Sequence, residues 1–232
     1  MNLLFFICGI LAVVSVVFIS LYMIFSGGPA IWKIGITDFL LGDVWDPSNK
    51  VFGILPMILA SVVATLVSVV IAVPIGVLTA VFLSHIPPKK AASSVRPMID
   101  LLSGIPSVVY GLLGAILIVP LVFKIQEAFN MPTGGCLLSA IVVLIIMILP
   151  TIVSMSETAL RAVPKAYYEA SLGLGGSKIQ TIFKVIIPAA KSGIVAGMVL
   201  GTGRAIGETM AVIMGAGNAV VLPELLKPVR LL

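Results

Sequence analysis

Long uncharged apolar runs constrain this chain more than any other feature of its sequence. Residues 3–25 contain no Asp, Glu, Lys or Arg, and about 20 apolar residues are enough to cross a hydrocarbon core of about 30 Å. Similar runs recur along the chain. Because lipid offers the backbone no hydrogen-bond partners, each run is expected to form a helix. The five predicted spans cover residues 3–25, 57–84, 101–123, 134–156 and 192–215.

The scarcity of charge excludes an ordinary water-soluble domain. Charged residues make up 10% of the chain and hydrophobic residues 60%, whereas soluble domains average about 25% charged residues. We therefore predict an all-α fold, a polytopic transmembrane helix bundle that forms one domain over residues 1–232. The net charge of +5 is attributed to loops that face the cytoplasm. Nucleic acid is not expected as a partner, because the sequence offers no soluble basic domain to bind it.

The distribution of Lys and Arg between the spans predicts their orientation. Eight of these residues lie in the segments after the second and fourth spans, namely Lys89, Lys90, Arg96, Arg161, Lys165, Lys178, Lys184 and Lys191. Five lie on the opposite side, namely Lys33, Lys50, Lys124, Lys227 and Arg230. Cytoplasmic loops carry an excess of Lys and Arg, so the N-terminus and the two more basic segments are predicted to be cytoplasmic.

The longest hydrophilic stretch, residues 157–191, lies between the fourth and fifth spans. Pro164 suits the first turn of a helix, and the glycines at 173, 175 and 176 are expected to end that helix. A second helical segment is predicted over 177–184. The pattern therefore predicts a short helix, a glycine-rich turn and another helix beside the membrane. A solvated loop without a partner is the alternative.

The sequence predicts neither catalysis nor a bound cofactor or metal. Residues 173–178 look like a phosphate-binding loop, but Lys178 follows Ser177 and precedes Ile179, whereas the Walker pattern needs Gly-Lys-Ser/Thr. His85 is the only histidine, and no His, Cys or carboxylate cluster has metal-ligand spacing. We expect a non-catalytic chain that depends on a separate subunit for any ATP hydrolysis.

Two charged residues interrupt the last predicted span. Arg204 lies about 18 Å into the span at 1.5 Å per residue, and Glu208 lies about one turn further on the same helix face. Charges at such depth are costly and usually face a protein interior or a water-filled path. Glycines at every fourth position, 193, 197 and 201, favour close packing of this helix against another.

Two interpretations of the charged pair stay open. In the first, Arg204 and Glu208 form a pair that only fixes helix packing. In the second, Arg204 offers its planar guanidinium to a passing oxyanion, while Glu208 holds the arginine in place and keeps its grip on the anion weak. The second interpretation predicts a substrate pathway along a helix–helix seam.

The hydrophilic stretch resembles the EAA loop of ABC importer permeases. That family pattern is Glu-Ala-Ala, a fixed glycine and then Ile-x-Leu-Pro. At the family spacing this chain has Glu169-Ala170-Ser171, Gly175 and Val185-Ile186-Ile187-Pro188. The resemblance implies that residues 157–191 form a coupling loop, with Glu169, Ala170, Ser171, Gly175 and Pro188 as ATPase-coupling residues that dock on a cytoplasmic ATPase subunit.

Further segments are similar to phosphate permeases. The last span contains Gly203-Arg204-Ala205-Ile206-Gly207-Glu208-Thr209-Met210-Ala211-Val212, which looks like a signature of that group, and Ile105–Gly111 matches another segment. Trp45-Asp46-Pro47 and Phe52–Pro56 resemble the start of the PstC-type subunit. This resemblance implies the fold of the type I importer permeases, with Arg204, Glu208 and Thr209 in the substrate pathway. Members have six spans, so a sixth is expected beyond the end of this chain.

The resemblance also implies a function and a set of partners. The chain is expected to be a permease subunit of an ATP-driven phosphate importer in a bacterial or archaeal cytoplasmic (inner) membrane, where it forms half of the translocation pathway. The implied partners are two cytoplasmic ATP-binding subunits, a second homologous permease, an extracytoplasmic phosphate-binding protein, inorganic phosphate and membrane lipid. The alternatives are transport of another oxyanion, such as sulfate or molybdate, and an ATP-independent secondary transporter or channel.

Overall fold

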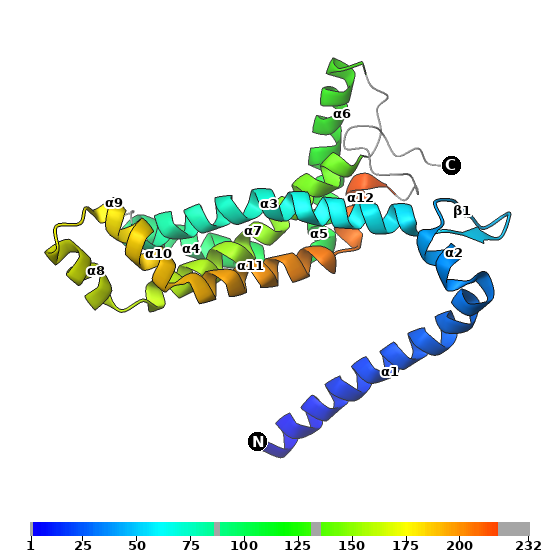
Figure 1. Ribbon diagram of the computed structural model, residues 1–232, viewed down its shortest axis with the longest axis horizontal. Helices are drawn as coiled ribbons and strands as arrows, with labels where there is room; N and C mark the ends of the chain where they lie inside the picture. Colours follow the sequence, from blue (N-terminus) through cyan, green and yellow to red (C-terminus); the bar gives the residue numbers. More distant parts are fainter. Residues whose placement is uncertain (1, 86–88, 131–135, 218–232) are drawn as a thin grey trace. The chain divides into compact units, whose positions relative to one another are not determined.

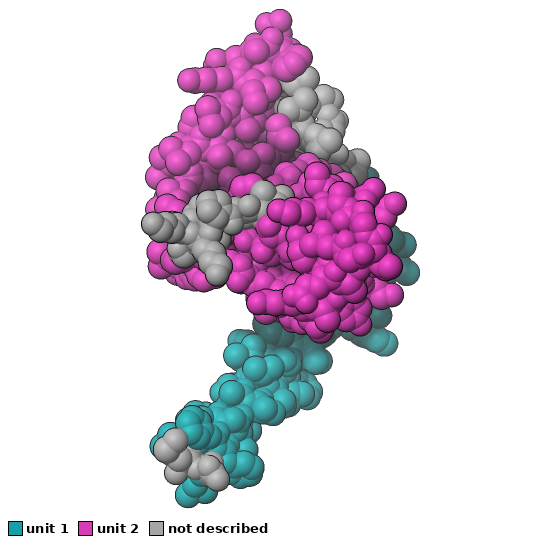
Figure 2. Space-filling view, turned by 90° about the vertical axis from the view of Figure 1, so that its left-hand side faces the viewer, with its two compact units in different colours: residues 1–58 teal, residues 59–232 magenta. Residues whose placement is uncertain are grey.

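The computed structural model describes residues 2–85, 89–130 and 136–217 (Figure 1). The chain divides into two compact units, Met1–Ile58 and Leu59–Leu232, which Figure 2 shows in different colours. Each unit is described by itself below. The predicted charges Lys227 and Arg230, and the first two residues of the predicted fourth span, lie outside the described residues.

Unit 1 consists mainly of one long helix. Helix α1 (Asn2–Ile34) continues nine residues beyond the predicted first span and includes Pro29. No part of its most apolar window is buried within the structure, as expected for a helix that faces lipid or a partner. Gly35 has a positive φ of 95° and separates α1 from the short helix α2 (Ile36–Leu41).

A small hairpin follows α2 and departs from the all-α expectation. Strands β1 (Trp45–Asp46) and β2 (Val51–Phe52) pair antiparallel, and the rings of Trp45 and Phe52 meet edge to face with centroids 5.4 Å apart. Gly42 and Gly53 lie so close together that a Cβ on either one would collide with the backbone of the other. A glycine is therefore needed at both positions.

Unit 2 is a helix bundle. It contains α3 (Leu55–His85) apart from the first four residues, which belong to unit 1. Helices α3, α7 and α11 run side by side, and α6 leads away from them (Figure 1). The other elements, in chain order, are α4 (Lys89–Gly104), α5 (Ser107–Leu113), η1 (Gly114–Ile118), α6 (Val119–Ala128), α7 (Leu137–Ala162), α8 (Lys165–Gly173), α9 (Lys178–Thr181), η2 (Ile182–Ile186), α10 (Ile187–Ala189), α11 (Lys191–Ile206) and α12 (Met210–Ala216).

Helix α7 forms the centre of unit 2. Its most apolar window is 61% buried, and it carries no charged side chain before Glu157. Its largest fully buried side chains are Ile141, Leu144, Met147, Ile148, Ile152 and Leu160. Helix α3 instead buries one side: the Ser68 hydroxyl donates to the Ile141 carbonyl, while Leu66 and Val70 are 59% and 69% exposed. An exposed apolar stripe at helical spacing fits a helix that faces lipid on its outer side.

Helix α11 packs on α7 through its glycines. A Cβ on Gly193 would collide with Ala159, one on Gly197 would lie 2.9 Å from the Met155 Cβ, and one on Gly201 would lie 2.8 Å from Ile152. The close packing predicted from the glycine spacing is therefore confirmed. Gly203 on the same helix has no such neighbour.

Each of the two π-helical segments is followed by a proline, and the spacing to the proline is the same in both. Segment η1 ends at Ile118, two residues before Pro120, and η2 ends at Ile186, two residues before Pro188. Proline lacks an N–H and its ring clashes with the carbonyl four residues earlier, which here lies inside the wider π-helical turn. The π-helical turns therefore let the helices continue through both prolines.

The expected all-α bundle of membrane helices is confirmed, but several helix bounds differ from the prediction. Within the described residues, four helices are long and apolar enough to cross a membrane, or five if the bent pair Lys178–Ala189 and Lys191–Ile206 counts as one span. The helix expected over 101–123 is broken at residues 105–106, and α4 occupies most of the segment expected to be a loop. The last span, expected as one helix over 192–215, is interrupted between Ile206 and Met210.

The contact between α11 and α7 predicts an asymmetric effect of two matched substitutions. Gly193→Ala adds a methyl group against Ala159, and overpacking of this kind costs about 1–3 kcal/mol. Gly203→Ala adds the same group to open space on the same helix, so it should leave stability unchanged or raise it slightly. Thermal unfolding of the purified variants in one detergent measures the difference. Equal melting temperatures for the two variants would contradict the close packing.

Candidate functional site

The first candidate site lies where α4, α7 and α11 meet. Gly201 brings α11 close to α7, and Arg204 is half-buried three residues further along. Its Nη1 atom donates to the Thr151 hydroxyl of α7 at 3.3 Å and lies 3.5 Å from the Ser103 carbonyl oxygen of α4. The arginine thus joins two neighbouring helices at the position where α4 ends.

Pro106 accounts for the end of α4. A residue that precedes proline is disfavoured in helical conformation, and here α4 ends at Gly104 while α5 begins at Ser107. The last carbonyls of a helix lack partners within it and carry a partial negative charge. Side chains from outside α4 satisfy two of them: the Tyr110 hydroxyl donates to Leu102 at 2.6 Å, and Arg204 contacts Ser103.

The structure does not bring Arg204 and Glu208 together, so the predicted pair on one helix face is wrong. Helix α11 ends at Ile206, so Glu208 lies beyond the helix that carries Arg204. The Glu208 Oε1 atom instead accepts a hydrogen bond from the Ala211 amide at 3.1 Å, at the start of α12. Among the described residues, the salt bridges involve neither side chain.

The separation of the pair changes the electrostatics of this site. Arg204 has neutral hydrogen-bond partners, a hydroxyl and a carbonyl, and in the described part of the chain no carboxylate forms an ion pair with it. A half-buried guanidinium with only neutral partners retains its full positive charge. Thr209, the third predicted pathway residue, is exposed beside the α11–α12 break. The arrangement can therefore attract an anion.

The second candidate site is the segment between α7 and α11. Val163 is extended before Pro164, which ends α7, and α8 follows at Lys165. Gly175 has a φ of 85°, a conformation that strongly favours glycine. Ser177 then caps α9: its hydroxyl accepts from the Gln180 amide, and the Gln180 side chain accepts from the Ser177 amide. The predicted short helix, glycine-rich turn and second helix are all present.

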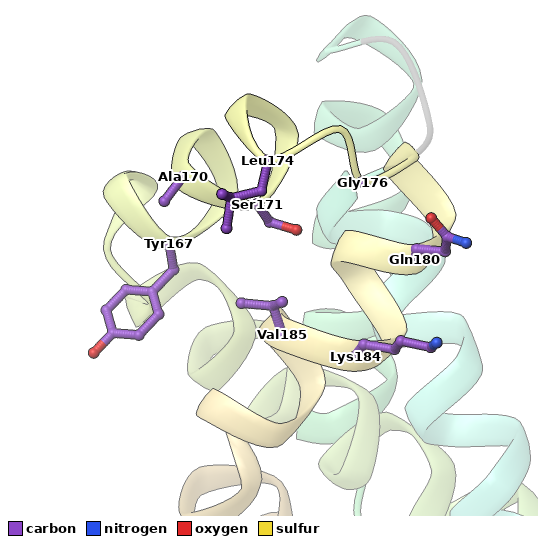
Figure 3. Close-up of a pocket in the computed structure, with 8 residues that line it drawn as sticks. All are labelled: Tyr167, Ala170, Ser171, Leu174, Gly176, Gln180, Lys184 and Val185. Carbon is purple, nitrogen blue, oxygen red and sulfur yellow. The ribbon is translucent and has the colours of Figure 1, made fainter.

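An open groove of about 470 Å³ separates α8 from α9 and η2 (Figure 3). Tyr167, Ala170 and Leu174 line it from α8 and its C-terminal end, and Val185 lies across from them. The Ser171 and Thr181 hydroxyls are 2.9 Å apart and connect the two sides. The proposed coupling residues Glu169 and Ala170 are exposed on α8. Leu174 is 90% exposed, so this segment presents apolar surface beside charged side chains.

A cluster that the sequence analysis missed lies beside this segment. The Glu157 Oε1 atom accepts from Arg96 Nε at 2.5 Å and from Arg161 Nε at 2.9 Å, and the Glu157 side chain is 9% exposed. Glu157 and Arg161 are four residues apart on α7, a spacing that predicts an ion pair on a helix. Arg96 comes from α4, 61 residues away in sequence, so no local pattern predicts its contact.

Comparison with known proteins identifies the family. Residues 72–226 match the model of the binding-protein-dependent transport system inner membrane component family. The chain is 38% identical to the probable ABC transporter permease protein YqgH of Bacillus subtilis, over 94% of this chain and 71% of that protein. It is 32% identical to the phosphate transport system permease protein PstC of Xylella fastidiosa, over 93% of this chain and 71% of that protein.

A solved structure has the same fold. The MetNI methionine ABC transporter in an inward-facing conformation superimposes with a TM-score of 0.55 and 25% sequence identity, over 68% of this chain and 70% of that one. The fold and the sequence matches together define a multi-pass membrane permease of the ABC importer class. The chain belongs to the binding-protein-dependent transport system inner membrane component family, and its resemblance to PstC-type permeases is confirmed.

The Glu157 cluster predicts a specific loss of stability. Glu157→Gln removes the charge that two guanidinium groups share, and loss of charge-assisted hydrogen bonds at a nearly buried group costs about 1–3 kcal/mol. Glu127→Gln is the matched control, because Glu127 is exposed on α6. Thermal unfolding should show a lower melting temperature for Glu157→Gln alone. An unchanged melting temperature would mean that the cluster contributes nothing to the fold.

Proposed function

We propose that this chain is the transmembrane permease subunit of an ATP-driven phosphate importer and forms half of the translocation pathway. The similarity to PstC proteins over 93% of this chain supports phosphate as the cargo. The observation that carries the proposal is the environment of Arg204, a half-buried cation with neutral partners at a junction of three helices. An oxyanion in transit supplies the negative charge that this junction lacks.

The weak contacts of Arg204 suit transport. Distances of 3.3 Å and 3.5 Å from Nη1 to its partners exceed the 2.7–2.9 Å or so that is typical of strong charge-assisted hydrogen bonds. The guanidinium can therefore exchange these partners for a phosphate oxygen at little cost. Glu208 and Thr209 follow in sequence at the α11–α12 break, where Glu208 accepts from the Ala211 amide, and we propose that its carboxylate limits the net positive charge of the pathway.

The coupling role is proposed for residues 157–191. Helix α8 is joined to α7 by Val163 and Pro164, and to α11 through α9, η2 and α10. An ATPase that moves α8 would therefore act on both the central helix and the helix that carries Arg204. Glu169, Ala170 and Ser171 on α8, Gly175 in the turn, and Pro188 before α11 are the proposed coupling residues.

The proposed assembly follows from this role. Two cytoplasmic ATP-binding subunits would contact the coupling loops, and a second homologous permease would complete the pathway. An extracytoplasmic phosphate-binding protein would deliver the anion. The loop 157–191 and the N-terminus are proposed to face the cytoplasm, and the chain itself is proposed to hydrolyse nothing. The competing cargo is another oxyanion, such as sulfate or molybdate, since a guanidinium binds any of them.

Replacing Arg204 should strongly reduce phosphate uptake. Arg204→Ala removes a charge-assisted contact, so uptake should fall by about ten- to a hundredfold, while Arg204→Lys should retain part of the activity because it keeps the charge but loses the planar fork. Lys124→Ala, at an exposed cation on α6, is the control. ATP-dependent uptake of radiolabelled phosphate into proteoliposomes with all partner subunits measures the effect. Full uptake by Arg204→Ala would contradict the proposed transit site. Uptake of sulfate in place of phosphate would contradict phosphate as the cargo.

Replacing Glu169 should prevent assembly with the ATPase subunits. Glu169→Arg reverses an exposed charge on α8, so the ATPase subunits should no longer co-purify with the permease, and uptake should be lost with them. Glu127→Arg reverses an exposed charge on α6 and should leave assembly intact. Co-purification from membranes measures assembly directly. Normal ATPase association in Glu169→Arg would count against the coupling loop, and uptake that continues without ATPase would place the protein among secondary transporters.

A further inference from the structure

A cavity lined by basic side chains lies at the junction of α7 and α8. Its volume is about 660 Å³, and it is enclosed by the ends of α3 and α7 together with parts of α4, α8 and η2. Its charged lining residues are Arg96, Arg161, Lys165 and Glu169. The Arg204 junction shares none of its lining residues.

The charges around the cavity favour an anion. Three cationic side chains face one carboxylate, that of Glu169. Glu157 and Asp100 line a smaller neighbouring cavity with the two arginines, so the excess of cations belongs to the lining of the larger cavity itself. The cavity also offers polar groups at Ser84, His85 and Tyr168. The positive charge of its lining distinguishes this cavity from the apolar groove between α8 and α9.

The two guanidinium groups are held in place but not saturated. Each uses its Nε atom to bind the same Glu157 oxygen, at 2.5 Å for Arg96 and 2.9 Å for Arg161. Within the described residues, their terminal nitrogens form no hydrogen bond. A guanidinium fixed through Nε keeps its two terminal N–H groups free to bind phosphate oxygens. Glu157 thus fixes two arginines that line both this cavity and the smaller one of about 170 Å³ beside it.

We propose that this cavity binds a phosphate-type oxyanion, held by Arg96, Arg161 and Lys165. The same chemistry describes free inorganic phosphate and the phosphodiester headgroup of an anionic lipid, and the volume accommodates either. The site is distinct from the transit path proposed at Arg204, so it goes beyond the cargo role. A bound anion would connect α4, the end of α7 and α8 across the Val163–Pro164 junction, and would thereby restrain α8 relative to the bundle.

A fluorophore inside the cavity tests the proposal. Tyr168 is half-buried in the cavity wall, 6.4 Å from the His85 ring between centroids, so Tyr168→Trp reports on the cavity itself. The assembled transporter, with Arg204→Ala added to remove anion from the transit path, is placed in phosphatidylcholine nanodiscs and titrated with sodium phosphate. Sodium chloride at equal ionic strength is the salt control, and the chain with Tyr168 intact corrects for Trp32 and Trp45.

The expected result is a saturable change in Tyr168→Trp emission with phosphate and none with chloride. Arg161→Gln should weaken the apparent affinity by about tenfold or more, and Lys165→Gln should weaken it as well. Lys178→Gln, at a cation outside the cavity, should leave the affinity unchanged. Equal elution and melting of the variants confirms that they are folded.

A second set of titrations distinguishes free phosphate from a lipid headgroup as the bound ligand. If phosphate has no effect in neutral nanodiscs but added phosphatidylglycerol shifts the emission, and Arg161→Gln abolishes that shift, the ligand is a lipid headgroup. No change with either ligand would overturn the proposal. A change that persists unaltered in both Arg161→Gln and Lys165→Gln would also overturn it. Because Arg204→Ala is present throughout, each of these outcomes is independent of the cargo assigned to the transit path.

Discussion

The close approach of α11 to α7 determines where the charged residue of the last span lies. Glycines at 193, 197 and 201 each face a side chain of α7 at a distance that leaves no room for a Cβ. One turn beyond the last of them, Arg204 reaches Thr151 on α7 and the end of α4. With a larger residue at 201 the helices would separate and the guanidinium would lose both partners. The packing of small residues thus places a charge inside an otherwise apolar bundle.

Prolines and glycines then create the polar groups that this charge meets. Pro106 ends α4 and leaves its last carbonyls without helical partners, and Tyr110 and Arg204 satisfy two of them. The turn at Gly207 ends α11 and frees Glu208 to cap α12. A continuous helix would have placed Glu208 one turn beyond Arg204 on the same face, where the carboxylate could have balanced the arginine. With the helix ended at Ile206, Glu208 instead accepts from the Ala211 amide.

Much of this architecture could be predicted from the sequence, and the failures have a common physical origin. Uncharged length predicted the membrane helices, glycine spacing predicted the α11–α7 contact, and Pro164 with Gly175 predicted the α8 turn. The separation of Arg204 from Glu208 could not be predicted, because four-residue spacing implies one face only while the helix continues. The Arg96–Glu157 contact and the Gly42–Gly53 approach depend on tertiary packing, and local sequence carries no signal for them.

The two arginine environments differ in how their charge is balanced, although their partners Thr151 and Glu157 lie only six residues apart on α7. At the α7–α8 junction, Arg96 and Arg161 share the Glu157 carboxylate, so their charge is partly balanced and their geometry is fixed. At the α4–α11 junction, Arg204 has only a hydroxyl and a carbonyl at longer distances, and within the described residues no carboxylate balances its charge. Under the two proposals, a cluster held by a carboxylate suits lasting occupancy, whereas an unbalanced cation with long contacts suits transient contact. Arg96 lies on α4, and the C-terminal end of the same helix contacts Arg204. A shift of α4 therefore changes both environments together.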